Sequence, residues 1–236
     1  MNTKKLKELG EYASVKHCID NYCISDKPIV FFEVGVFDGK TSNGFYSMVC
    51  ANDRSDNKYF AFEPDSRNYD KIVSNDNFPI KKSGVELIKK ALNSKTGIFK
   101  LFCSSGKQEG GENEYDCCSS LLEPDEVNEL FPFIKFEETE EVDCITIDDF
   151  CSEKNIDYID FIFADIQGAE LEMLKGAESM ISKIKFLFLE KSDNQKLYAN
   201  QPLTEDLIKY LSDRGFEVAK KFDSDILFYN KNLTHK

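Results

Sequence analysis

One stretch near the N-terminus, residues 29–65, constrains what this chain can fold into more than any other. Ile29–Val34 is an apolar run of strand length, and a glycine-containing turn and a helical pattern follow it. A second apolar run, Lys58–Phe62, ends directly at the acid Glu63. Open α/β sheets use a strand, glycine turn, helix, strand and terminal acid in this order to bind an adenosine-bearing cofactor. The stretch therefore predicts such a sheet, with the cofactor at its carboxyl edge.

The rest of the chain continues this alternation of strand and helix patterns. Helices are expected at 66–75, 148–154, 168–182 and 203–213, and buried strands at 85–92, 158–165 and 185–190. The last two apolar runs, FEVAKKF and DILFYN, predict an antiparallel pair. The alternation as a whole predicts a mostly parallel, three-layer α/β/α sandwich with a terminal antiparallel hairpin.

Two segments stand apart from the alternation. Residues 1–27 carry apolar side chains at helical spacing, which predicts an amphipathic helix packed on the domain. Residues 28–236 are expected to form a single domain with an insertion at about 104–136, which begins with the polar, glycine-rich sequence SSGKQEGGENEYD. Strands are expected on both sides of it, at 97–103 and 141–147. The insertion is therefore predicted to lie over the edge of the sheet.

The charge of the chain limits the classes of partner. Lys and Arg total 30 and Asp and Glu total 43, so the formal net charge is −13. An acidic surface disfavours nucleic acid and anionic membranes, and no apolar run approaches the roughly 20 residues that span a bilayer. The N-terminus lacks the continuous apolar core of a secretory signal, which favours a cytoplasmic protein.

The eight cysteines show no spacing typical of a metal site. Cys117 and Cys118 are adjacent, which suits neither an ordinary disulfide nor a zinc site. Several others lie in apolar stretches, where a thiol behaves as a small hydrophobic group. The cysteines are expected to be reduced and mostly structural, as in a cytoplasmic protein.

Four acids lie at or near the ends of the predicted strands: Glu33, Glu63, Asp165 and Glu190. The carboxyl ends of the strands line one crevice in an open α/β sheet, so the four side chains are expected to converge. One such acid would mean little, because strands commonly end in solvent. Four on one edge, in a chain with only two histidines, predict a functional site.

The glycine turn narrows the choice of cofactor. Gly35 permits a tight backbone path, and Gly39 opens a helix whose N-terminus offers unpaired N–H groups to an anion. The dinucleotide fingerprint GxGxxG is absent, which disfavours a nicotinamide cofactor. Glu63 follows Gly39 by 24 residues and can accept both hydroxyls of a ribose. S-adenosylmethionine suits the whole set, because it brings ribose hydroxyls, a carboxylate and a sulfonium cation.

Several motifs together resemble one family. The order EVGVFDGKTS, YFAFEPD, VELIKKAL, SSLL, ITIDDF, FIFADIQGAELEMLKGA and FLFLE is similar to that of the FkbM-type S-adenosylmethionine-dependent methyltransferases, over about residues 28 to 230. The most specific pieces are AFEP and the run from Asp165 to Ala177. The resemblance implies a class I, Rossmann-like methyltransferase fold. It also implies methyl transfer to a hydroxyl, commonly on a sugar or a secondary metabolite.

The resemblance implies that Glu33, Gly35, Gly39 and Glu63 bind the cofactor, and that Asp165 lies beside its methionine end and the acceptor. We predict as cofactor-binding residues Glu33, Gly35, Phe37, Gly39, Ser42, Glu63, Pro64 and Asp165. Two positions depart from the family pattern. Glu33 stands where Asp is usual, and Ala164 stands where a Lys often precedes the Asp. Lys191 is a candidate substitute for that lysine.

Methyl transfer to an alcohol requires that a proton be removed, so a base or a metal ion is expected. Asp165 is the first candidate for the base and Glu190 the second. Alternatively, the two carboxylates hold a divalent cation such as Mg²⁺, which prefers oxygen ligands. Ser119, Ser120 and Lys191 are predicted to contact the acceptor, although the two serines equally suit a turn.

The sequence thus predicts an S-adenosylmethionine-dependent O-methyltransferase acting on a small molecule, most plausibly a sugar or sugar nucleotide. Methylation of an amine or a phosphorylated amino-alcohol is an alternative on the same fold. A non-catalytic, cofactor-binding partner subunit is a second alternative, and a dehydrogenase is disfavoured by the missing glycine. The chain is expected to be a monomer or a homodimer that modifies carbohydrate.

Overall fold

A computed structural model of the chain describes residues 1, 3–23, 27–50, 56–76, 78, 82, 84–111 and 114–234. Small parts of the predicted segments, at 2, 24–26, 51–55, 77, 79–81, 83, 112–113 and 235–236, lie outside these ranges. Seven strands form the main sheet in the order β3-β2-β1-β7-β8-β10-β9. Their bounds are β1 Val30–Val34, β2 Lys58–Phe62, β3 Val85–Ile88, β7 Ile159–Ala164, β8 Ile184–Glu190, β9 Phe216–Lys221 and β10 Asp225–Asn230. Neighbouring strands are parallel except at β10, which runs antiparallel to β8 and β9. The mostly parallel sheet with a terminal antiparallel pair is confirmed.

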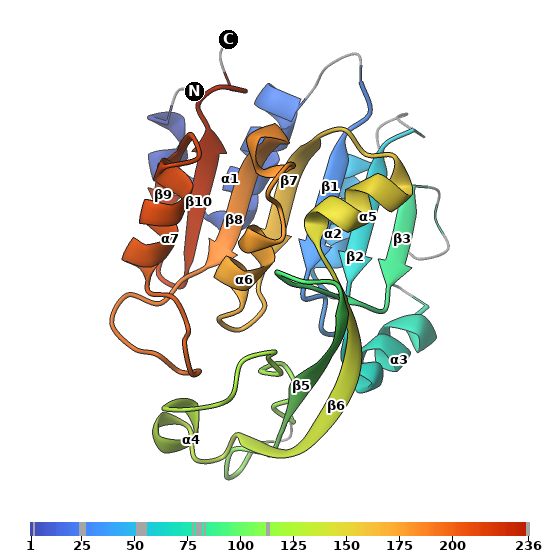
Figure 1. Ribbon diagram of the computed structural model, residues 1–236, viewed down its shortest axis with the longest axis vertical. Helices are drawn as coiled ribbons and strands as arrows, with labels where there is room; N and C mark the ends of the chain where they lie inside the picture. The colour runs from blue at the N-terminus through green and yellow to red at the C-terminus, as the bar shows by residue number, and fades with distance from the viewer. Residues whose placement is uncertain are drawn as a thin grey trace.

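Helices cover both faces of this sheet (Figure 1). On one face, α5 (Ile147–Lys154), α6 (Glu170–Lys175) and α7 (Thr204–Ser212) contribute Phe150, Leu174 and Leu207 to one buried cluster. On the other face, α1 (Glu11–Cys18), α2 (Ser42–Val49) and α3 (Ser66–Ser74) contribute Val15, Phe45 and Ile72 to a second cluster. The three-layer α/β/α arrangement is therefore confirmed.

Strand β1 shows how the two faces are divided. Val30, Phe32 and Val34 lie in the cluster with α5, and Phe31 lies in the cluster with α2. Successive side chains of a strand point to opposite faces, so Glu33 shares the face of Phe31. This alternation directs the Glu33 side chain toward α2.

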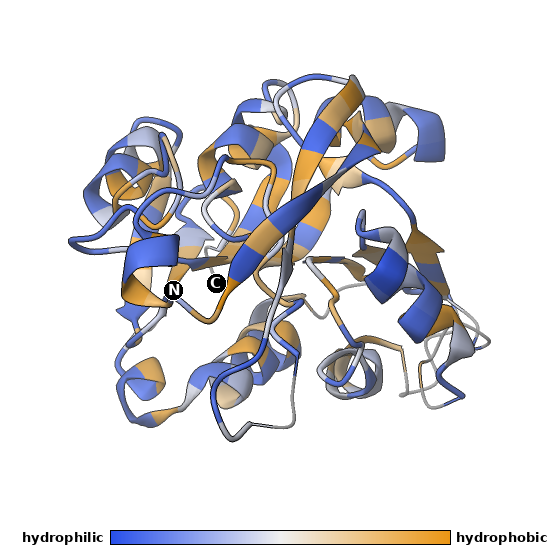
Figure 2. Ribbon diagram, turned by 90° about the horizontal axis from the view of Figure 1, so that it is seen from below, coloured by the Kyte–Doolittle hydropathy of each residue, from blue (hydrophilic) through white to orange (hydrophobic). Residues whose placement is uncertain are grey.

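A second, smaller sheet lies across the carboxyl ends of the parallel strands (Figure 1). It contains β4 (Ala91–Leu92), β5 (Gly97–Ser105) and β6 (Lys135–Ile145). The long antiparallel ribbon of β5 and β6 is closed by residues 106–134, which carry α4 (Val127–Leu130). Viewed from the end where the ribbon lies, hydrophobic colour is concentrated in the central strands and hydrophilic colour in the surrounding helices and loops (Figure 2).

Several predicted boundaries are wrong. The single helix expected within residues 1–27 is divided into a 3₁₀ turn (Lys5–Glu8), α1 and a π-helical turn (Ile19–Cys23). The strand expected at 85–92 is two strands, and its second half belongs to the smaller sheet. The strand expected at 141–147 begins earlier, at Lys135. The first half of this strand exposes charged side chains, and the sequence pattern there is typical of a loop, so the prediction missed it.

The helix expected at 168–182 is also shorter, because α6 stops at Lys175. A Cβ atom on Gly176 would lie 2.1 Å from the backbone oxygen of Asn93, so the chain approaches that backbone too closely for a side chain. Asp148 then accepts hydrogen bonds from the backbone N–H groups of Ser179 and Met180, 2.8 and 2.9 Å long, which hold the following turn. Among the described residues, no helix is long and apolar enough to cross a membrane.

Candidate active site

The ends of β1, β2 and β7 meet in one continuous edge. The N–H of Gly35 donates to the oxygen of Phe62, and the N–H of Asp165 donates to that of Val34, both at 3.0 Å. Gly35 has a φ of +85°, and a Cβ atom there would lie 2.0 Å from the backbone oxygen of Asp165. Only glycine can occupy this position, because the β1–α2 turn passes directly over the end of β7.

Glu63 lies at this edge, just after β2. One carboxylate oxygen accepts a 2.8 Å hydrogen bond from the N–H of Phe37, and the other a 3.0 Å bond from the N–H of Asp65. Phe37 is in the left-handed region, with a φ of 57°, and this turns its N–H toward Glu63. Only 5% of Glu63 is exposed, and burial raises its pKa to about 8. Each oxygen keeps a lone pair for a ligand hydroxyl.

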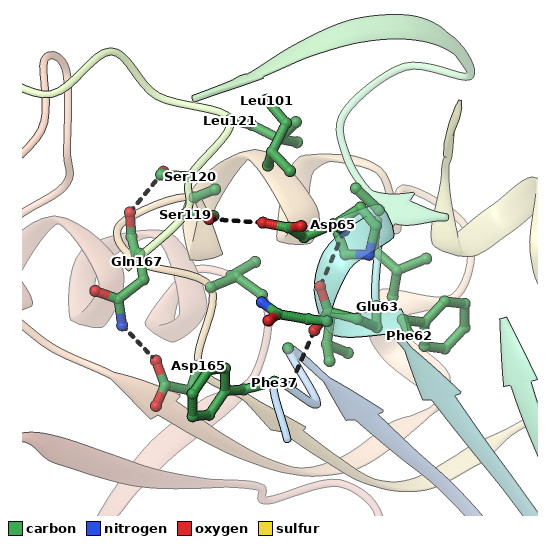
Figure 3. Close-up of a pocket in the computed structure, with 18 of the residues that line it drawn as sticks. Phe37, Phe62, Glu63, Asp65, Leu101, Ser119, Ser120, Leu121, Asp165 and Gln167 are labelled. Atoms are coloured by element: carbon green, nitrogen blue, oxygen red, sulfur yellow. Dashed lines mark hydrogen bonds between the residues drawn. The ribbon is translucent and has the colours of Figure 1, made fainter. Parts of the chain in front are cut away.

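A cavity opens between this edge and the smaller sheet (Figure 3). Its floor comes from the ends of β1, β2 and β7, and its roof comes from β4, β5 and residues 116–121. Apolar side chains of Phe62, Leu101 and Leu121 form one part of its wall. Seven of the predicted site residues line it: Gly35, Phe37, Glu63, Pro64, Asp165, Ser119 and Ser120.

Asp165 and Glu190, the carboxylate pair, lie side by side because β7 and β8 are neighbours in register. The Nε2 of Gln167 donates to Asp165 at 2.7 Å and to Glu190 at 3.3 Å. Burial raises the pKa of Asp165 above the ordinary value, and a hydrogen bond from Glu190 partly opposes this. Burial and the charge of Asp165 raise the pKa of Glu190 much further. Asp165 therefore carries the charge of the pair, and Glu190 carries the proton.

The roof is tied to the floor through the two predicted serines. Ser119 donates a 2.9 Å hydrogen bond to Asp65, which also accepts a 2.6 Å ion pair from Arg67. Burial acts to raise the pKa of Asp65, but hydrogen bonds and the charge of Arg67 hold it below its usual value. Ser120 donates to the backbone oxygen of Gln167 at 2.8 Å. Both hydroxyls thus bind the roof to the floor, which agrees with the prediction that the two serines suit a turn. Their predicted contact with the acceptor stays a prediction.

Glu33 has a different environment. Its carboxylate accepts hydrogen bonds from Thr41 (2.9 Å), Ser42 (2.7 Å) and Tyr59, a set we call the Glu33 cluster. Glu33 is fully buried, and burial raises its pKa to about 7. The cluster lies on the α2 side of the sheet and fastens the start of α2 to β1 and β2.

Four further predicted residues also lie outside the cavity wall as far as the described residues define it, and one of them is Glu190 of the carboxylate pair. A Cβ atom on Gly39 would lie 2.6 Å from the ring of Phe78, so this glycine packs against that side chain. Ser42 belongs to the Glu33 cluster. The Lys191 ammonium forms a 2.5 Å ion pair with Asp193, which gives it a structural partner.

The described residues contain no group of three or more His, Cys, Asp or Glu side chains arranged to hold a metal ion. Coordination of Mg²⁺ by the carboxylate pair therefore stays a prediction. It would require Asp165 and Glu190 to exchange their shared proton and their contacts with Gln167 for a cation.

The polar wall residues that the sequence interpretation missed include Asp65, Gln167 and Cys117. Asp65 follows the AFEP motif and caps α3, where its side chain accepts a hydrogen bond from the N–H of Arg67. Gln167 stands inside the specific run that begins at Asp165, so that motif could have indicated it. For Cys117 the only signal was its adjacency to Cys118.

The order of the strands in the main sheet, with β10 alone reversed among its described strands, and a cavity over the ends of β1, β2 and β7 define the class I methyltransferase fold. The model of the methyltransferase FkbM domain matches residues 33–218 of this chain. The chain therefore belongs to the FkbM methyltransferase family.

Two known proteins are similar to this chain, one in sequence and one in fold. The 2-O-methyltransferase NoeI of Sinorhizobium fredii is 27% identical over 208 residues, which cover 86% of this chain and 80% of that protein. A crystal structure of a methyltransferase FkbM from Methylobacillus flagellatus is 18% identical, with a TM-score of 0.50. The match covers 86% of this chain but only 44% of that one, so this chain spans less than half of the solved protein.

Proposed function

We propose that this methyltransferase uses S-adenosylmethionine to methylate a hydroxyl group of a small molecule, and that this molecule is a carbohydrate. The observation that carries the proposal is Glu63. Its carboxylate is buried at the end of β2, faces the cavity and keeps acceptor capacity on both oxygens. A ribose offers two neighbouring hydroxyls to such a carboxylate.

The remaining wall fits the rest of this cofactor. Gly35 has no side chain, so the β1–α2 turn passes directly over the end of β7 and its backbone forms part of the cavity wall. Apolar side chains, including Phe62, Leu101 and Leu121, offer a surface for a flat base. Asp165, at the other part of the wall, favours a nearby cation (Figure 3). When bound there, S-adenosylmethionine supplies an electrophilic methyl group on a positively charged sulfur.

Asp165 is the base that this arrangement supports. Its raised pKa makes it a better proton acceptor than an ordinary aspartate, and Gln167 fixes its orientation with a 2.7 Å hydrogen bond. Asp165 accepts the proton of the acceptor hydroxyl as that oxygen takes the methyl group. Glu190 stays protonated and donates to Asp165, which keeps the charge on the side chain that lines the cavity. The walls of the cavity hold the acceptor in line, the main source of rate in such a displacement.

The chemistry of the wall supports a carbohydrate as the acceptor. Asp165 and Gln167 offer carboxylate and amide oxygens that accept hydrogen bonds from neutral hydroxyls. Two cations near the wall have acidic partners, Arg67 with Asp65 and Lys71 with Asp116, and Lys90 is the lysine that lines the cavity among the described residues. The relative from Sinorhizobium fredii is named for methylation at an oxygen, which supports a hydroxyl over an amine.

A direct test uses a panel of neutral sugars, oligosaccharides, sugar nucleotides and amines with isotope-labelled S-adenosylmethionine, read by mass spectrometry. We expect a single added methyl group on a sugar oxygen. Asp165→Asn should lower the rate by about 10²- to 10⁴-fold, the usual contribution of a general base. Its affinity for S-adenosylhomocysteine should stay within about threefold of wild type, because Asn keeps the shape of the wall.

The wild-type rate should also fall as the pH is lowered through the raised pKa of Asp165, because a protonated carboxyl cannot accept a proton. Asp165→Asn should lose this dependence. Methylated amines would support the alternative acceptor class. Cofactor binding without transfer to any compound would instead support a non-catalytic subunit, and full activity of Asp165→Asn would contradict the assignment of the base.

A further inference from the structure

Two adjacent thiols lie at the cavity. All eight cysteines are free, but Cys117 and Cys118 alone are neighbours in sequence, and their Sγ atoms are 3.7 Å apart. Cys117 is exposed and lines the cavity, whereas Cys118 is half-buried below it. Cys117 is therefore accessible to solvent at the cavity wall, with Cys118 beside it.

The backbone of Cys118 is connected to the carboxylate pair. Its carbonyl accepts a 2.7 Å hydrogen bond from the hydroxyl of Tyr198, which also lies 3.4 Å from the Oε1 of Gln167. The other end of the Gln167 amide donates to Asp165 and Glu190. A movement of the Cys118 carbonyl is thus transmitted to the residue that orients the base.

The roof of the cavity continues directly from this pair. The N–H of Cys118 donates to the hydroxyl of Ser104 at 2.9 Å, and the next residue, Ser119, is bound to Asp65. Ser120 is bound to the backbone of Gln167. A change in the backbone at 117–118 therefore affects both anchors of the roof.

The two thiols differ in reactivity. A hydrogen bond from Cys118 lowers the pKa of Cys117 to about 7, although burial and the charges of Asp165 and Asp38 act in the opposite direction. The same hydrogen bond and burial raise the pKa of Cys118. Cys117 therefore carries the thiolate, which is the form that reacts with oxidants, and Cys118 is placed to resolve its oxidised form.

We propose that Cys117 and Cys118 form an oxidant-sensitive dithiol that shuts down the methyl-transfer site when a hydroperoxide converts it to a vicinal disulfide. The Cys117 thiolate attacks a peroxide oxygen and becomes a sulfenic acid, while the O–O bond breaks and the leaving oxygen takes a proton. Cys118 then loses its proton and attacks the Cys117 sulfur. The S–S bond forms, and the departing hydroxide takes that proton to become water. Two thiols are oxidised and one peroxide is reduced.

Because Cys117 and Cys118 are consecutive, a disulfide between them changes the local backbone conformation. Consecutive Cα atoms are about 3.8 Å apart, which is below the range of about 4.4–6.8 Å that an unstrained disulfide spans. The backbone must therefore shift when the bond forms, and the strain makes the bond readily reducible. A shift of about 1 Å near reacting groups can cost about 100-fold in rate. We expect oxidation to lower methyl transfer by about tenfold or more, an effect that rests on the proposed function.

The first test treats the purified chain with hydrogen peroxide and follows the peptide that contains Cys117 and Cys118 by mass spectrometry. We expect the mass to fall by two hydrogens without alkylation of either thiol, and dithiothreitol to restore both mass and activity. Formation of the bond is measured independently of activity. A chain that forms the disulfide but transfers no methyl group in either state would therefore contradict the proposed function and leave the thiol chemistry in place.

Variants locate the effect. In Cys118→Ser, the ratio of oxidised to reduced activity should be close to one at short exposure, because the sulfenic acid has no resolving thiol. Cys50→Ser, which removes another partly exposed thiol far from the pair in sequence, should keep the wild-type ratio. Equal loss of activity in wild type and Cys118→Ser, or the absence of a disulfide in wild type, would overturn the proposal.

A second probe avoids oxidation and does not depend on how a variant folds. Phenylarsine oxide bridges two thiols that lie close together, so it should bind the wild-type chain once and inhibit it. A dithiol should reverse the inhibition, whereas an equal concentration of a monothiol should not. Inhibition that a monothiol reverses equally well would show that a single thiol is the target, which contradicts a paired site.

Discussion

Glu33 and Glu63 offer a direct comparison within the sheet edge. Glu33 lies in β1 and Glu63 directly follows β2. Burial raises the pKa of Glu33 to about 7 and the pKa of Glu63 to about 8. The carboxylate of Glu33 is satisfied by three side-chain hydroxyls of the Glu33 cluster. That of Glu63 is held by two backbone N–H groups and faces the cavity.

The difference arises from the position of each acid relative to the strand end. Glu33 is the fourth residue of β1 and is followed by Val34, so the alternation of side chains directs it toward α2. Glu63 comes after the last residue of β2, where the chain is free to turn its side chain upward. Glu33, inside its strand, therefore binds side chains of the helical layer, and Glu63, just beyond its strand, lines the cavity.

The largest expected effect separates the two acids by cofactor affinity. At a pH about one unit above the Glu63 pKa of about 8, where this carboxyl is ionised, Glu63→Gln should weaken binding of S-adenosylhomocysteine by about 100-fold. Hydrogen bonds to a charged acceptor are each worth about 1.5–3 kcal/mol, and tenfold corresponds to about 1.4 kcal/mol. Glu33→Gln should change the affinity by less than about threefold. Isothermal titration calorimetry on both folded variants measures the difference.

This measurement also decides the role that the sequence predicts for Glu33. If Glu33→Gln loses as much affinity as Glu63→Gln while its circular dichroism spectrum stays native, Glu33 binds the cofactor directly. The comparison drawn from the structure would then fail. Unchanged affinity in both variants would instead remove the proposed position of the ribose.

The fold could be predicted because most of the parallel strands, such as β1, β7 and β8, are apolar runs bounded by polar residues. Lys58–Phe62 matches β2 residue for residue, and the terminal antiparallel pair is present as β9 and β10. The β5/β6 ribbon was only partly predictable. Most of β6 between Lys135 and Glu141 exposes its side chains, so it lacks the pattern of burial that indicates a strand. This part of β6 is a strand because it forms backbone hydrogen bonds with β5, and a local sequence pattern does not show such pairing.

The same reasoning applies to the site. Strand ends predicted the edge at which Gly35, Glu63 and Asp165 meet, because parallel strands align their carboxyl ends. The direction of each side chain at that edge depends on one residue of register, and sequence patterns leave that uncertain. Contacts between distant segments, such as Tyr198 with Gln167, depend on the packing of loops and have no local signal.

A smaller effect tests the structural role of the Glu33 cluster. Tyr59→Phe removes one of the three hydroxyls that stabilise the buried carboxylate, and we expect it to lower the free energy of unfolding by about 2 kcal/mol at pH 8. Tyr229→Phe is the matched control, because its hydroxyl contacts the exposed Glu217 and its loss should cost less than about 0.5 kcal/mol. Urea denaturation compares the two. Equal losses in the free energy of unfolding would show that the Tyr59 hydroxyl does not stabilise the buried Glu33 carboxylate more than an exposed hydrogen bond would.

The smallest effect concerns the dependence of stability on pH. A carboxyl whose pKa is higher in the folded state than in the unfolded state favours folding fully below the unfolded value, 4.5, and loses this contribution as the pH rises through the folded value. Glu33 should therefore lower stability with a slope of at most about 1.4 kcal/mol per pH unit up to about pH 7, and Glu63 up to about pH 8. The other buried acids act equally in all variants.

The free energies of unfolding of the two Gln variants therefore diverge between about pH 7 and about pH 8. Relative to wild type, Glu33→Gln should gain stability from pH 4.5 to about 7 and then stay level, whereas Glu63→Gln should gain until about pH 8. The separation between the two curves, about 1 kcal/mol, is measurable by urea denaturation at half-unit intervals of pH. Curves that level off together would mean that the carboxylate facing the cavity and the one sealed under α2 have the same environment. The distinction between a structural acid and a cofactor-binding acid would then have no electrostatic basis.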